Sequence, residues 1–309
     1  MSSNVPMWLG MKEKNFTIEE VMNYQISNTD VSQEFLEKTL RDFYCKEESC
    51  KGWETNVVTQ PKTVKNIMGV GASRVAAGLG IGEALPDKNL ASKIDHTLLK
   101  PDATPDEIRK LCDEASKFKF ASVCINPGYV SFCSSLLKGT GVKICTVIGF
   151  PLGSNTTETK KFEAEQAIQN GANEIDMVMN VGQHKQGNYE YVFNDISQVV
   201  LTAKKNNAIC KVILETALLT DDEKIKACLI CKKAGADFVK TSTGFSKGGA
   251  TVGDVALMKY VVGSGIGVKA SGGIRSKEVA QAMIASGADR IGASASVKIV
   301  SGEKSDSNY

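Results

Sequence analysis

From residue 90 onward, short apolar runs alternate along the chain with longer stretches in which apolar residues recur at helical spacing. Short apolar runs bounded by turn residues are typical of strands that are buried on both faces of a sheet. Strands that alternate with helices in this way form parallel βα units. The eight predicted strands cover residues 93–97, 122–125, 142–148, 174–179, 210–215, 238–241, 267–270 and 290–293.

The segments between the predicted strands carry signals for helix starts and helix ends. Thr104 and Glu107 form a capping box with Pro105 at the first helical position. Eight βα units in about 214 residues fit the smaller (β/α)8 barrels, which begin at about 200 residues. We therefore predict an α/β fold, a (β/α)8 TIM barrel, with an open doubly wound sheet as the competing arrangement. A glycine suited to end a helix precedes three of the strands, at Gly171, Gly235 and Gly287.

Residues 1–88 differ in pattern from the rest of the chain. Thr17 and Glu20 form a capping box before a run of apolar residues at helical spacing, and a second amphipathic pattern covers residues 31–44. We therefore divide the chain into a helical N-terminal extension of unknown role at 1–88 and a barrel domain at 89–309. Because two short helices cannot form an independent core, we expect the extension to pack on the barrel, on a second subunit or on a partner.

Composition and charge exclude several classes of protein. The chain has 309 residues, of which 42% are hydrophobic and 23% are charged, as in ordinary globular proteins. A formal net charge of +2 is too balanced for a protein that binds nucleic acid. No run approaches the roughly 18 uncharged apolar residues of a membrane helix, and the N-terminus lacks the pattern of a secretory signal. We expect no nucleic-acid partner and no membrane partner.

The cysteines indicate the compartment. There are nine, an odd number without the spacing of a disulfide scaffold, and Cys124, Cys145 and Cys210 lie within apolar strand-like runs. Thiols that serve as small buried hydrophobic groups are typical of a reducing environment. The sequence therefore predicts a cytoplasmic protein.

Two lysines in consecutive predicted strands are the most informative candidate residues. Lys240 and Lys269 each stand within an apolar run. Lysine is unfavourable in strands and is rarely buried without a partner, so two in succession argue against lysines that merely extend to the surface. Burial and a neighbouring ammonium both disfavour the charged form of a lysine. The resulting neutral amine can attack a carbonyl and form a Schiff base.

An acidic residue and three glycine-containing segments complete this chemistry. Asp176 lies within an apolar predicted strand, where it is either a structural carboxylate or, beside a Schiff-base lysine, a group that shuttles protons. Backbone N–H groups at glycines can approach phosphate oxygens, and barrels often hold a phosphate after their last strands. We therefore expect a phosphate group to bind at the segments that follow the last three strands, 241–249, 270–274 and 292–294.

The histidines favour chemistry without a metal. His96 and His184 are the only two, and they are far apart in the sequence, so the usual ligand set of a zinc-dependent aldolase is not visible. We predict that the protein uses no metal and no cofactor.

Six phrases along the predicted barrel point to a known family: IDHTLLKPDAT (94–104), VCINP (123–127), VIGFPLG (147–153), EIDMV (174–178), FVKTSTGF (238–245) and GVKASGGI (267–274). On these phrases the chain resembles, over about residues 90–302, deoxyribose-phosphate aldolases of the class I, Schiff-base-forming type. The resemblance implies reversible cleavage of 2-deoxy-D-ribose 5-phosphate to D-glyceraldehyde 3-phosphate and acetaldehyde, with a small sugar phosphate as substrate and possible homo-oligomers. A Schiff-base aldolase for another sugar phosphate and a non-catalytic sugar-phosphate-binding barrel are the alternatives.

The resemblance also implies roles for individual residues. Lys240 would form the Schiff base, Lys269 would be the neighbouring ammonium, and Asp176 would share proton shuttling with Lys269. Ala295 departs from the family pattern, in which a second serine is frequent, and this puts one phosphate contact in question. Whether Tyr309 takes part in catalysis is left open by the sequence. The further positions implied are Asp95, Thr97 and Cys124 in the pocket, and Gly244, Gly272, Gly273 and Ser294 at the phosphate, with Lys247 assisting.

Overall fold

The structure, a computed structural model, describes residues 88–302. The helices predicted in the N-terminal extension, and Tyr309, lie outside the described residues. The described part is a barrel of eight parallel strands in chain order, and β1 pairs with β8 to close it. The TIM-barrel prediction is therefore confirmed, and the open doubly wound sheet is excluded. The strands are β1 (Ile94–Leu98), β2 (Ser122–Ile125), β3 (Lys143–Ile148), β4 (Glu174–Val178), β5 (Ile209–Ile213), β6 (Phe238–Lys240), β7 (Gly267–Ser271) and β8 (Arg290–Ala293).

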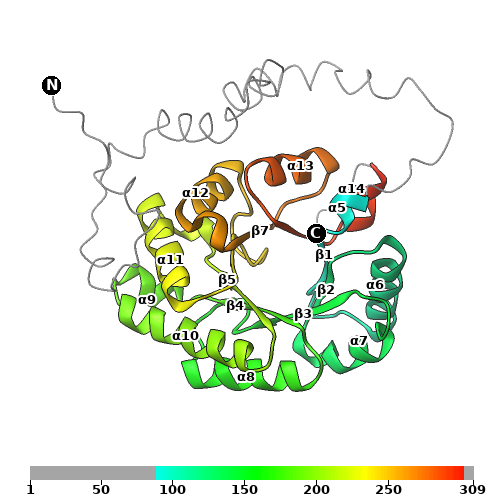
Figure 1. Ribbon diagram of the computed structural model, residues 1–309, viewed down its shortest axis with the longest axis horizontal. Helices are drawn as coiled ribbons and strands as arrows, with labels where there is room; N and C mark the ends of the chain where they lie inside the picture. Colours follow the sequence, from blue (N-terminus) through cyan, green and yellow to red (C-terminus); the bar gives the residue numbers. More distant parts are fainter. Residues whose placement is uncertain (1–87, 303–309) are drawn as a thin grey trace, which may run out of the picture. The chain divides into compact units, whose positions relative to one another are not determined.

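Helices form an outer ring around the strands (Figure 1). Because helices cover the outside of the barrel and side chains fill the inside, every residue of β2 and β4 is buried. None of the helices between residues 88 and 302 is long and apolar enough to cross a membrane. The helices are α5 (Lys88–Ala91), α6 (Pro105–Phe118), α7 (Val130–Leu136), α8 (Thr157–Gln169), α9 (Val181–Lys185), α10 (Tyr189–Lys205), α11 (Asp221–Ala234), α12 (Val252–Val262), α13 (Lys277–Ala285) and α14 (Ser296–Ser301).

The local signals of the sequence act where they were expected. Thr104 caps α6, with its side chain accepting from the backbone N–H of Glu107 and the Glu107 side chain returning to the cap. Gly235 follows α11 in the left-handed conformation, with a φ of 77°, which a residue without Cβ adopts freely. These caps fix where each helix ends, and thereby where the next strand enters the barrel.

Candidate active site

Asp176 of β4 is the centre of a buried group of charged side chains inside the barrel. Its Oδ2 accepts from Lys240 Nζ at 2.8 Å and from Lys269 Nζ at 2.7 Å. The two lysines are register partners on β6 and β7, so both side chains project to the same side of the sheet. The Oδ1 of Asp176 accepts from Lys211 Nζ of β5 at 2.9 Å. The structure therefore brings the three predicted catalytic residues together, because both lysines donate to the carboxylate of Asp176.

The ion pairs continue from Asp176 into a closed ring. Lys269 Nζ also lies 2.5 Å from Asp95 Oδ2, and Lys211 Nζ lies 2.6 Å from Glu174 Oε2. Arg290, at the start of β8, donates to both Asp95 and Glu174 and so joins the two ends. Ser122 adds a hydrogen bond of 2.7 Å to Asp95 Oδ1. In this ring, which we call the ion-pair ring, charges of opposite sign alternate: Arg290, Asp95, Lys269, Asp176, Lys211 and Glu174.

The ring keeps Asp176, Asp95 and Lys269 charged although they are buried. Burial alone would raise the pKa of Asp176, but the ammonium groups of Lys211, Lys240 and Lys269 outweigh it and hold that pKa well below its usual value. Burial would also raise the pKa of Asp95, but the charges of Lys269 and Arg290 outweigh burial and lower that pKa. The pKa of Lys269 is raised, because the attraction of Asp176 and Asp95 exceeds the desolvation that would lower it. In the free protein Lys269 is thus an ammonium beside Lys240.

Two cysteines lie against the same carboxylate. Cys124 of β2 and Cys145 of β3 are register partners, and both are fully buried. Cys145 Sγ lies 3.2 Å from Asp176 Oδ1 and accepts from Lys211 Nζ at 3.4 Å. The two Sγ atoms and a carboxylate oxygen of Asp176 all lie within 4.8 Å of one another. Together the three residues form a candidate metal-binding group that the sequence did not reveal. Because Lys211 and Lys240 already donate to Asp176, a divalent cation would meet strong repulsion there, and metal-free chemistry stays our prediction.

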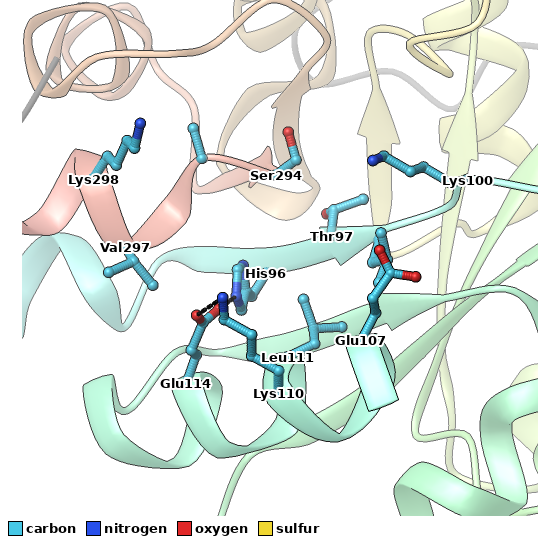
Figure 2. Close-up of a pocket in the computed structure, with 12 residues that line it drawn as sticks. His96, Thr97, Lys100, Glu107, Lys110, Leu111, Glu114, Ser294, Val297 and Lys298 are labelled. Carbon is cyan, nitrogen blue, oxygen red and sulfur yellow. Dashed lines mark hydrogen bonds and ion pairs between the residues drawn. The ribbon is translucent and has the colours of Figure 1, made fainter. Parts of the chain in front are cut away.

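A cavity of about 410 Å³ lies between β1, α6 and α14 (Figure 2). Two of the predicted substrate-binding residues, Thr97 and Ser294, line it. His96 also lines it, and its Nε2 lies 2.7 Å from Glu114 Oε2. This contact gives His96 a structural partner within α6.

The glycines predicted to hold phosphate lie beyond the ends of β6 and β7. Gly244, Gly272 and Gly273 all have positive φ values, of 86°, 89° and 76°. At Gly272 a Cβ atom would stand 3.0 Å from the Cα of Gly249, whereas at Gly273 it would meet no atom within 4 Å. Gly273 therefore leaves open space beside its backbone, which an anion can use. Lys247 and Ser294 are exposed.

Four residues at the centre were not predicted from the sequence: Lys211, Glu174, Arg290 and Cys145. Lys211 stands within an apolar run, and this is the same signal that singled out Lys240 and Lys269. Glu174 and Arg290 are the first residues of β4 and β8. Barrel enzymes usually carry their catalytic residues at the C-terminal ends of the strands. A search limited to those ends misses residues at the strand starts, such as Glu174 and Arg290.

Comparison with known proteins places the chain in a family. Residues 90–302 match the model of the DeoC/LacD family aldolases. The chain is 60% identical over 223 residues to a deoxyribose-phosphate aldolase of Geobacillus sp., which covers 72% of this chain and all of that protein. It is also 60% identical over 222 residues to a deoxyribose-phosphate aldolase of Clostridium perfringens, which covers 72% of this chain and 99% of the relative. The solved structure of the tetrameric deoxyribose phosphate aldolase from Aeropyrum pernix matches with 40% identity and a TM-score of 0.66, over 71% of this chain and 92% of that one.

A closed barrel that buries two lysines against one carboxylate has the groups that a Schiff-base aldolase needs. The chain belongs to the DeoC/LacD aldolase family, and both curated relatives described above, each 60% identical to it, are deoxyribose-phosphate aldolases.

Proposed function

We propose that this protein reversibly cleaves 2-deoxy-D-ribose 5-phosphate to D-glyceraldehyde 3-phosphate and acetaldehyde through a Schiff base on Lys240. The observation that carries the proposal is that Lys240 Nζ and Lys269 Nζ share Oδ2 of Asp176 inside the barrel. Family membership supports the substrate, since the relatives from Geobacillus and Clostridium perfringens are deoxyribose-phosphate aldolases. No metal is needed, because the imine itself withdraws electrons from the bond that breaks.

The charge balance of the site explains why Lys240 is the nucleophile. The ion-pair ring holds three cations and three carboxylates and is therefore neutral on its own. Lys240 adds a fourth cation outside the ring, through its contact with Asp176. Lys240 contacts a single carboxylate, whereas Lys211, Lys269 and Arg290 each contact two, so Lys240 is the cation that the buried group can most readily spare. The neutral amine can then attack the aldehyde carbon of the substrate.

The remaining steps follow from the neighbours of Lys240. After water leaves the adduct, the imine draws electrons from the C2–C3 bond, which breaks as the C3 hydroxyl gives up its proton. We assign this proton to Asp176, through a water molecule, with Lys269 as the partner that holds the carboxylate in place and returns the proton to the enamine carbon. Hydrolysis of the resulting imine releases acetaldehyde and restores Lys240.

We place the phosphate at the open end of the barrel. Gly244, Gly272 and Gly273 would offer backbone N–H groups, Ser294 would offer its hydroxyl and Lys247 its charge. Asp95, Thr97 and Cys124 would line the pocket between this point and Lys240. A homo-oligomer, as in the tetrameric relative from Aeropyrum pernix, stays a prediction for this chain.

Borohydride trapping tests the proposal. Incubation with acetaldehyde and borohydride should add one ethyl group to Lys240, as mapped by peptide mass spectrometry. Lys240→Arg should abolish both the adduct and turnover, while Lys233→Arg, at an exposed position on α11, should change neither. A non-catalytic barrel would give no adduct. An aldolase for another sugar phosphate would give an adduct but would turn over a different member of a sugar-phosphate panel faster than 2-deoxy-D-ribose 5-phosphate.

A further inference from the structure

Cys124 and Cys145 form a pair of thiols for which the proposed cleavage has no chemical use. Register partners on adjacent parallel strands lie about 4.8 Å apart at their Cα atoms, and this falls within the separation of about 4.4–6.8 Å that disulfides span. The two side chains are on the same face of the sheet, and their Sγ atoms lie within 4.8 Å of one another. A bond between them therefore requires side-chain rotation but no large movement of the backbone.

The two thiols differ in acidity. A hydrogen bond from Cys145 and the charge of Lys269 outweigh burial and lower the pKa of Cys124 to about 7. Burial raises the pKa of Cys145 well above its usual value. Near neutral pH the pair thus combines a reactive thiolate with a protonated thiol, the combination found in cysteines that sense oxidants.

Access to the pair follows from the proposed function, on which this inference rests. Both thiols are fully buried, yet a sugar phosphate has to reach Lys240, whose Nζ lies 2.8 Å from Asp176 Oδ2. The sulfur of Cys124 lies within 4.8 Å of a carboxylate oxygen of the same aspartate. A path that admits the substrate to Lys240 also admits hydrogen peroxide, a much smaller molecule, to Cys124.

We propose that Cys124 and Cys145 are a peroxide-sensitive dithiol that closes to a disulfide and switches the active site off. The Cys124 thiolate attacks hydrogen peroxide, so that an S–O bond forms, the O–O bond breaks and hydroxide leaves. The sulfur of Cys145 then attacks the sulfenic acid, so that the S–S bond forms and water leaves with the proton of Cys145. The two thiols together lose two electrons, and the peroxide gains them.

The disulfide would disturb the site at its centre. Cys145 contacts Asp176 Oδ1 and Lys211 Nζ, and the contact with Asp176 uses the hydrogen of its free thiol. Drawing this sulfur toward Cys124 removes them and alters the carboxylate that Lys240 and Lys269 share. Oxidation should therefore lower turnover, and a thiol reductant should restore it.

A second thiol pair provides a matched control. Cys112 of α6 and Cys133 of α7 are also buried and in hydrogen-bond contact, and the pKa of Cys112 is also lowered. This pair lies in the helical layer, where no substrate has to pass. Comparison of the two pairs separates thiol chemistry that depends on the open path to Lys240 from oxidation of buried cysteines in general.

The experiment treats the full-length protein with hydrogen peroxide at pH 7 in the presence of EDTA, which removes adventitious metal. Turnover is measured before and after dithiothreitol, and disulfides are mapped by peptide mass. We expect a loss of at least about tenfold in turnover, its recovery with dithiothreitol, and a Cys124–Cys145 disulfide with the loss of two hydrogen masses. Cys112→Ala should respond like the wild type.

Cys145→Ala, with Cys145→Ser as a second variant should the first not fold, lacks the second thiol. Each variant is compared with its own activity under reducing conditions. Because loss of the Cys145 thiol removes the main cause of the lowered Cys124 pKa, the exposure to peroxide is extended until Cys124 reaches sulfinic acid, a loss that dithiothreitol does not reverse. A disulfide at Cys112–Cys133 alone, or recovery of Cys145→Ala to the same extent as the wild type, would overturn the proposal. Because the mass map does not require turnover, the absence of this disulfide can be told apart from failure of the aldolase assignment.

Discussion

Replacement of Lys269 by leucine tests the electrostatic role assigned to this lysine. The nitrogens of Lys269 and Lys240 lie 2.7 Å and 2.8 Å from one oxygen of Asp176, so they are at most about 5.5 Å apart. Two unit charges at that separation repel by about 3 kcal/mol at an effective dielectric constant of about 20. Removal of Lys269 therefore makes protonated Lys240 more favourable by about this amount, which corresponds to about two pH units.

The assay is the pH dependence of kcat/KM together with the pH dependence of borohydride trapping by acetaldehyde. In Lys269→Leu the acid limb of both profiles should move about two pH units toward alkaline values. Turnover at the optimum should also fall by orders of magnitude, because the variant loses its proton donor. Trapping needs only imine formation, so it reports the electrostatic effect even where turnover is too slow to measure.

Lys269→Arg is the matched control, since arginine retains the cation between Asp95 and Asp176. Its acid limb should stay close to that of the wild type although the proton transfer is impaired. An unchanged acid limb in Lys269→Leu, measured on protein that is folded by circular dichroism, would refute the argument from neighbouring charges.

Three further predictions concern the ion-pair ring and metals. Arg290→Met should lower the free energy of unfolding, measured in urea, by about 3 kcal/mol. This is the lower end of the range for a broken buried ion pair, and we expect it because Asp95 and Glu174 each retain a lysine partner. The pKa of Asp95 and that of Asp176 are lowered in the folded state, so both carboxylates stabilise the fold above about pH 4. This stabilisation is lost as the pH falls toward their pKa values in the folded protein. Asp95→Asn should therefore weaken the dependence of the free energy of unfolding on acid pH, as measured by urea titration. EDTA should leave turnover unchanged, and a loss that zinc reverses would show that a metal acts in the site.

The strands were largely predictable, because the barrel buries them on both faces and they read as short runs that are mostly apolar, with single charged residues inside several of them. The predicted ranges 122–125 and 290–293 coincide with β2 and β8. The run at 210–215 extended too far, since β5 ends at Ile213 and Glu215 adopts a left-handed φ of 58°. Hydrophobicity does not reveal such a turn, because it depends on the backbone and on neighbouring segments.

The ion-pair ring could be predicted only in part. A lysine within an apolar run is visible in the sequence, but its ion-pair partner is not, because the ring joins residues that are far apart in the chain. Arg290 pairs with Asp95, 195 positions away, and Lys269 pairs with Asp176, 93 positions away. Strand order and register decide these contacts. Glu174 and Arg290 were missed for this reason, although both are charged residues at the start of buried strands.

A chain that begins at Lys88 should remain an aldolase. Every residue of the ion-pair ring and every candidate substrate contact lies between Ile94 and Ser294, and the barrel closes through β1 and β8 within that range. All of the Geobacillus relative aligns with 223 residues of this chain, 72% of its length, which supports the expectation that a shorter chain is sufficient for an aldolase. We expect kcat/KM within about twofold of the full-length value, since the buried charges that set the chemistry are unchanged.

Turnover, melting temperature and mass by light scattering should be measured on both chains at equal concentration. A lower melting temperature or a different mass would assign the extension to stability or assembly, as its amphipathic pattern predicts. Folded protein with the barrel's circular dichroism but without turnover would instead show that residues 1–87 contribute to the active site.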